Sequence, residues 1–112
     1  MLGTTLLAIA PLVLWHAYSG GEERALDQVA RSWNAAATAK AQPPVELVAV
    51  PYDRLAYKLQ AAIPRKHGPD LFILAHDHVG EWSAQGLLTP LDGLDGAVPG
   101  LDPARARALH AG

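Results

Sequence analysis

Three short apolar runs, separated by longer stretches with helical spacing, constrain the fold of this chain more than any other feature. The runs carry no charge except one glutamate, and they cover Leu12–Trp15, Val45–Val50 and Leu71–Leu74. Continuous apolar runs are typical of strands that are buried on both faces of a parallel sheet. Their alternation with helices predicts an α/β fold, a parallel β-sheet covered by helices in βαβαβα order.

The segment after the first run has the spacing and the end signals of a helix. Glu22 and Glu23 suit the first turn, where carboxylates complement the helix dipole, and Ser19 or Gly20 could cap it. The helix is expected to run to about Ala39, before two consecutive prolines. Its apolar face is formed by Leu26, Val29, Ala30, Trp33 and Ala37.

Two further helices are expected, each with its own boundary residues. Asp53 is expected to cap the second helix, and Pro64 is expected to end it. The third covers Val79–Gln85, with Gly86 at the position where many helices end in a left-handed residue. A weakly apolar helix is expected over residues 102–109.

Composition limits the classes of function. The 112 residues suffice for one domain. The net charge of −2, with scattered basic residues, gives no electrostatic reason to expect nucleic acid as a partner. The chain has no cysteine, which excludes disulfides, thiolate metal sites and cysteine nucleophiles.

The first ten residues leave two interpretations open. They are apolar and uncharged in their side chains, and Ala8-Ile9-Ala10 has the small-x-small form of a signal-peptidase site. Residues 1–10 are therefore either the truncated tail of an export signal peptide or a lead into the first strand. No apolar run reaches the roughly 18 residues that span a bilayer, because His16 interrupts the first one.

The predicted topology places two loops at one edge of the sheet. Right-handed crossovers bring the loops His16–Gly21 and Ala75–Gly80 to the carboxyl ends of parallel strands. In open α/β sheets, ligands bind at this edge. The two loops are therefore expected to form one wall of a ligand cleft.

Both loops carry motifs of a known family. The segment Leu14–Glu22 has a Trp-His pair followed by glycines and a glutamate. The second block has Gly68-Pro69-Asp70, an apolar strand, Ala75-His76-Asp77, Gly80, and then Gln85-Gly86-Leu87-Leu88. In order and spacing, these blocks resemble the family 1 extracellular solute-binding proteins of the maltose-binding-protein type, the sugar receptors of bacterial ABC importers.

The resemblance covers Leu12 to Leu91 and implies the first part of a larger receptor. It implies that residues 11–112 are a partial N-terminal lobe of a periplasmic-binding-protein type II fold. The full receptor would hold a sugar or oligosaccharide between two lobes and dock on the membrane permease subunits of an ABC transporter. The resemblance also implies an exported protein, periplasmic or extracellular and associated with the membrane, with no cofactor and no enzymatic activity.

The resemblance implies four ligand-binding residues: Asp77, His78, Tyr18 and Ser19. Asp77 matches the sugar-bonding aspartate of the family, and His78 stands where the maltose-binding type has an arginine. Tyr18 and Ser19 fall near polar contacts in the first loop. Leu74 replaces a stacking tryptophan, so that platform is absent. Each of these residues also has a structural alternative. Asp77 could cap the following helix, Tyr18 and Ser19 could have turn or cap roles, and His78 could be a solvated loop residue.

Two other functions are compatible with parts of the sequence. His76, Asp77 and His78 are suitable metal ligands, which allows a metal-dependent hydrolase fragment. However, residues i and i+2 of an extended loop point in opposite directions, and His76 is expected to be buried. The other alternative is a stand-alone α/β interaction domain. The sequence contains no helical His-Glu-x-x-His zinc motif and no Gly-x-Ser-x-Gly nucleophile elbow.

Overall fold

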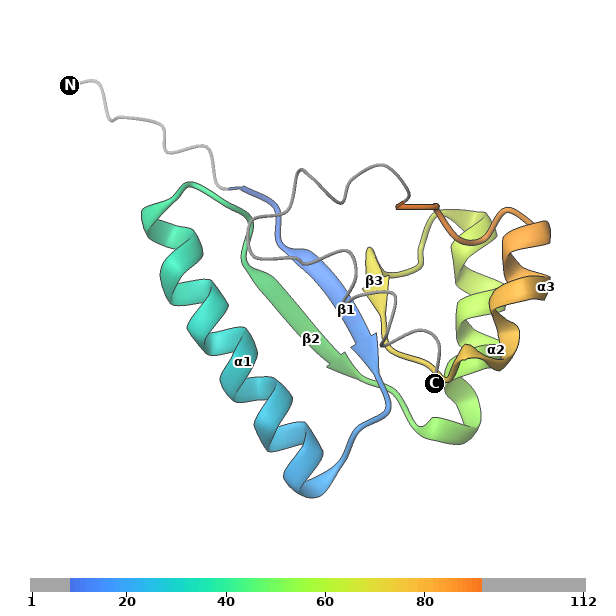
Figure 1. Cartoon of the computed structure of the whole chain (residues 1–112), viewed down its shortest axis with the longest axis horizontal. Helices are drawn as coiled ribbons and strands as arrows, with labels where there is room; N and C mark the ends of the chain where they lie inside the picture. Colours follow the sequence, from blue (N-terminus) through green and yellow to red (C-terminus); the bar gives the residue numbers. More distant parts are fainter. Residues whose placement is uncertain (1–8, 92–112) are drawn as a thin grey trace, which may run out of the picture. The chain divides into compact units, whose positions relative to one another are not determined.

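The computed structural model describes residues 9–91 (Figure 1). The chain divides into two compact units, Met1–Asp77 and His78–Gly112. The elements follow one another as β1 α1 β2 α2 β3 α3, which confirms the predicted α/β class and the βαβαβα order. Two short 3-10 turns, Ile63–Arg65 and His76–His78, precede β3 and α3.

The first unit is built on a three-stranded parallel sheet in the order β2-β1-β3. The strands are β1 (Leu12–His16), β2 (Val45–Ala49) and β3 (Leu71–Phe72). β1 pairs along its whole length with β2, but only two of its residues pair with β3. In Figure 1, α1 lies alongside β2, and α2 lies beyond β3.

β3 begins at Leu71 as predicted but ends at Phe72, two residues before the predicted end at Leu74, and bonds to β1 flank it at both ends. The Val13 N–H donates to Oδ2 of Asp70 at 2.8 Å, and the Asp70 N–H donates to the Val13 carbonyl at 2.9 Å. At the other end, the Ile73 N–H still donates to the Trp15 carbonyl at 3.0 Å before the chain leaves the sheet.

Helix α1 (Gly20–Ala39) ends where it was predicted to end. Ser19 occupies the N-cap position, although its side chain makes no capping bond. At the other end, Ala41 adopts a left-handed φ of 53°, and the Gln42 N–H donates to the Ala37 carbonyl at 3.0 Å. This pairing satisfies a carbonyl of the last turn, as glycine-ended helices commonly do.

The predicted apolar face of α1 is only partly buried. Ala30 and Ala37 are buried, but Val29 and Trp33 are 65% and 42% exposed. The helix therefore packs on the sheet through its small residues, and the larger two lie on its flank. The Trp33 indole N–H donates to the Pro43 carbonyl at 3.0 Å, so this ring covers the turn before β2.

Helix α2 (Tyr52–Ala62) begins one residue before Asp53, so the prediction that Asp53 caps it was wrong. Pro51 holds the N-cap position, and its carbonyl accepts the N–H groups of Arg54 and Leu55 at 2.9 and 3.0 Å. Asp53 instead lies in the first turn, where its charge suits the helix dipole. Leu55 and Leu59 have no exposed surface and form the centre of the core.

The second unit contains α3 (Val79–Ala84), one residue shorter than predicted. Gly86 has a φ of +74°, its N–H donates to the Ser83 carbonyl, and the Leu87 N–H donates to the Trp82 carbonyl. These two bonds form a Schellman motif, which confirms the predicted end of this helix. Trp82 is 1% exposed.

Some expectations fall wholly or largely outside the described residues. Of residues 1–10, only Ile9 and Ala10 are described, and the expected helix over 102–109 is not described. Within residues 9–91, no helix is long and apolar enough to cross a membrane.

Candidate ligand site at the carboxyl edge of the sheet

The strand order creates a recognisable place for a ligand. From β1 the chain moves to β2 on one side, and it then passes back across β1 to β3 on the other side. The direction of the winding therefore reverses between β1 and β3. In open α/β sheets, ligands bind outside the carboxyl ends of the strands at such a reversal.

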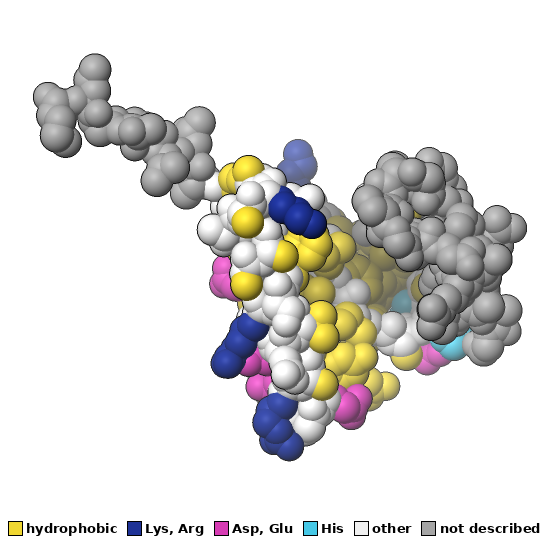
Figure 2. All heavy atoms as spheres, turned by 60° about the vertical axis from the view of Figure 1, so that its left-hand side comes forward, with side chains coloured by type: hydrophobic (Ala, Val, Ile, Leu, Met, Phe, Trp, Pro, Cys, Tyr) yellow, Lys and Arg dark blue, Asp and Glu magenta, His cyan; other side chains and the backbone are white. Residues whose placement is uncertain are grey.

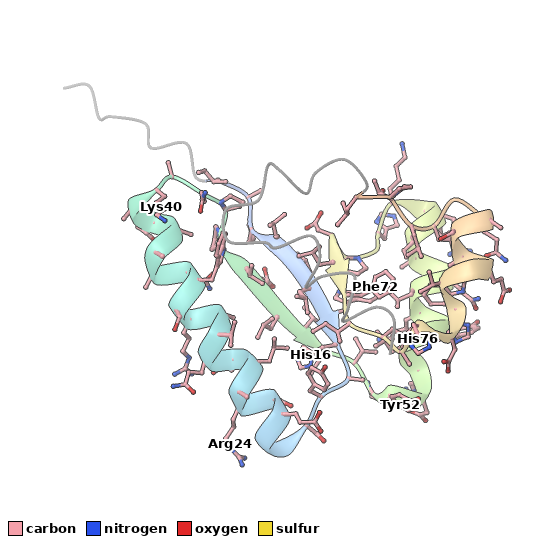
Figure 3. All side chains as sticks on the ribbon, in the orientation of Figure 1. His16, Arg24, Lys40, Tyr52, Phe72 and His76 are labelled. Atoms are coloured by element: carbon pink, nitrogen blue, oxygen red, sulfur yellow. The ribbon has the colours of Figure 1, made fainter. Side chains whose placement is uncertain are left out.

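A pocket of about 260 Å³ lies at this place, and we name it the switch-point pocket. Segments that follow all three strands line it, and the lining residues are Ala17, Tyr18, Tyr52, Leu55, Ile73, Leu74 and Ala75. Figure 3 shows His16, Tyr52 and His76 toward this end of the sheet, whereas Lys40 lies toward the other end. Residues far apart in the sequence thus meet here because the strands are parallel.

Tyr18 is held in the pocket wall by the histidine that ends β1. His16 is 2% exposed, and its Nδ1 accepts the Tyr18 N–H at 3.1 Å. The centres of the two rings are 5.9 Å apart, with an angle of 37° between their planes. Because Nδ1 is an acceptor, the neutral imidazole carries its proton on Nε2. His16 therefore fixes both the backbone and the ring of Tyr18.

The other three predicted ligand residues do not line the pocket. Ser19 is exposed at the start of α1, and Asp77 is exposed two residues after the lining residue Ala75. Among residues 9–91, Asp77 has no hydrogen-bond or ion-pair partner, so its carboxylate is not used as a helix cap. His78 belongs to the second unit, where its ring stacks on Trp82 with centres 4.9 Å apart and planes 15° apart.

The expectation that His76 is buried was wrong. His76 is exposed, because the chain makes a 3-10 turn on the surface instead of folding the loop inward. Within the described part of the chain, no group of three histidine, cysteine, aspartate or glutamate side chains could hold a metal ion. The geometry of residues 9–91 therefore offers no support for the metal-dependent hydrolase.

Tyr52 is the lining residue that the sequence analysis missed. It is the first residue of α2 and is 74% exposed. The predicted cleft wall contained only the loops after the first and third strands. The signal was nevertheless available, because β2 is also parallel, and the residues that follow it must reach the same edge.

A second hollow of about 280 Å³ lies between α1 and the sheet. It is lined by His16 and by the oppositely charged Glu23, Arg24 and Asp27, together with Leu47 and Ala49. Asp27 also forms an ion pair with Arg31 at 2.9 Å. Figure 2 shows acidic and basic side chains interspersed along this helix, so the face in view presents no field of a single sign.

Comparison with known proteins identifies the family of this chain. Residues 25–109 match the family model of the bacterial extracellular solute-binding proteins. The chain belongs to this family. Membership confirms the resemblance that the two loop motifs indicated.

A named member of comparable sequence is the maltotriose-binding protein of Pyrococcus abyssi (strain GE5 / Orsay). The two proteins are 37% identical over 81 residues, which is 72% of this chain. The match covers only 17% of the archaeal protein. The chain therefore spans only a small part of the length of this relative.

Proposed function

We propose that this chain is part of the substrate-binding component of an ABC importer for sugars or oligosaccharides. The observation that carries the proposal is the switch-point pocket, which lies at the edge where α/β sheets bind ligands. Membership of the solute-binding family and similarity to a maltotriose-binding protein support a sugar as the ligand. In the complete protein, this edge would form one wall of a cleft between two lobes.

The proposed mechanism is recognition without bond chemistry. A sugar hydroxyl both donates and accepts hydrogen bonds, so a carboxylate such as Asp77 can accept from it, and a hydroxyl such as Ser19 can do either. His78 supplies a ring N–H donor. Closure of the lobes around the ligand would create the form that docks on the permease, outside the cytoplasmic membrane.

The test is calorimetric titration of the complete protein with maltotriose. We expect Asp77→Ala to weaken binding by about 1.5–3 kcal/mol, the contribution of a hydrogen bond to a charged group. Glu46→Ala is the control, because Glu46 is an exposed carboxylate near the start of β2, at the opposite end of the strand from the pocket. Equal affinity of the Asp77 variant and the wild type would remove Asp77 from the site. No binding of maltotriose or of a panel of other neutral sugars would refute the function itself.

A further inference from the structure

The lining of the switch-point pocket has a marked chemical bias. None of its seven residues carries a charge, and only Tyr18 and Tyr52 have a polar side-chain atom. A charged ligand group that lost its water there would find no opposite charge among the lining side chains. The pocket is therefore suited to the C–H face of a neutral ring, with hydroxyl groups at its margin.

An aromatic side chain is the usual partner for such a face, and the pocket offers two. The Tyr18 ring is half-buried and already packs on His16, with ring centres 5.9 Å apart. Tyr52 is 74% exposed, so most of its surface is free to take a ligand. Leu74, at the end of the segment after β3, contributes apolar surface but no ring.

We propose that Tyr52 is the aromatic platform of this site and that it packs on the apolar face of a neutral sugar ring. The proposal rests on the proposed function and assigns a specificity-determining residue within it. Tyr52 occupies the first turn of α2, and Leu55 of the same turn has no exposed surface. The backbone that carries the platform is thus anchored in the core, while the ring itself stays accessible.

The chain supplies a matched control for this residue. Tyr57 lies on the same helix and is 76% exposed, but it does not line the pocket. Removal of either ring deletes the same atoms from an exposed helical position. A difference between the two variants therefore reports on the pocket and not on the loss of an exposed tyrosine.

The experiment measures maltotriose affinity of the complete protein and its Tyr52 and Tyr57 variants by calorimetry. We expect Tyr52→Ala to weaken binding by roughly tenfold, the contribution of one aromatic contact. Tyr52→Phe and Tyr57→Ala should stay within about threefold of the wild type. Tyr52→Leu keeps apolar bulk but lacks the ring, so it should resemble the alanine variant. If Tyr52→Ala does not fold, Tyr52→Leu serves as the test.

A spectroscopic readout separates stacking from a structural role. In the wild type and in Tyr52→Phe, the ring current should shift the C–H proton signals of bound maltotriose upfield, and Tyr52→Leu should remove the part of the shift that the Tyr52 ring contributes. Maltose 1-phosphate should bind at least about tenfold more weakly than maltose, because the pocket has no countercharge. If maltose 1-phosphate binds as tightly as maltose or more tightly, the proposal that the pocket takes a neutral ligand is overturned.

The two proposals fail in different ways. If the wild type binds maltotriose and Tyr52→Leu binds it equally well with an unchanged ring-current shift, the platform is overturned and the receptor function stands. If the wild type binds no neutral sugar, both proposals are overturned.

Discussion

Asn34 carries a contact whose contribution to stability can be estimated from the structure. Its side chain joins α1 to Val45, the first residue of β2. The Nδ2 group donates to the Val45 carbonyl at 3.1 Å, and Oδ1 accepts the Val45 N–H at 2.7 Å. Within the described sheet β2 is an edge strand, and the Leu12 N–H of β1 bonds to Pro44. The Val45 groups therefore face away from β1, and the Asn34 amide takes the place of one residue of a neighbouring strand.

The expected effect of Asn34→Ala follows from these two bonds. Each contributes about 1 kcal/mol, and their loss leaves two half-buried backbone groups to find water. Alanine recovers about 0.5 kcal/mol through its higher helix propensity. The free energy of unfolding should therefore fall by about 1.5 kcal/mol. Asn34→Asp keeps the acceptor for the Val45 N–H but places a carboxylate against a carbonyl, so we expect at least as large a loss.

The assay combines urea unfolding with hydrogen exchange of the Val45 amide. Gln28→Ala is the control, because Gln28 is an exposed amide on the same helix with no hydrogen-bond partner among residues 9–91. The Val45 amide should exchange faster in Asn34→Ala than in the wild type. In Asn34→Asp it should exchange more slowly than in Asn34→Ala, because the acceptor for this N–H is kept. The reasoning is refuted if Asn34→Ala unfolds at the same urea concentration as Gln28→Ala and the Val45 exchange rate is that of the wild type.

Three further predictions concern single positions. Ala41→Gly should stabilise the protein by about 0.5–1 kcal/mol in urea unfolding, because Ala41 has a left-handed φ of 53°; destabilisation would contradict this. Gly68→Ala should cost about 1–3 kcal/mol in the same assay, because its Cβ would lie 2.9 Å from Cγ1 of Ile63; wild-type stability would show that Ile63 moves freely. His16→Phe should speed hydrogen exchange of the Tyr18 amide, which loses its Nδ1 acceptor, and His16→Asn should do so less; equal rates would exclude this role of His16.

The boundaries that sequence predicted well depend on local chemistry. Gly86 ends α3 because a residue without Cβ adopts a positive φ at low cost, and this preference is visible in the sequence. The prolines after α1 mark its end in the same way. The boundaries that failed depend on contacts that the local pattern does not show. β3 ends at Phe72, and the chain leaves the sheet after the Ile73 N–H bonds to the Trp15 carbonyl, which nothing in the apolar run Leu71–Leu74 reveals.

The buried face of α1 also could be predicted only in part from the sequence. Helical spacing identified the correct stripe of apolar residues, but it could not tell Ala30 from Val29, one position away. The distance between helix and sheet decides which of them is covered, and a close approach selects the smaller side chain. Helical periodicity shows which side of the helix a side chain lies on. Whether that side chain is buried depends on what packs against that side of the helix.

For the site, sequence predicted the edge more securely than its residues. Parallel strands bring every segment that follows a strand to one edge, so Tyr18 could be placed there from topology alone. By the same logic an aromatic platform can come from any of these segments. In this chain β3 is followed by Leu74, and β2 is followed by Tyr52; both reach one pocket. The loss of an aromatic residue after one strand therefore does not imply that the site lacks a ring, because the fold lets a neighbouring segment supply it.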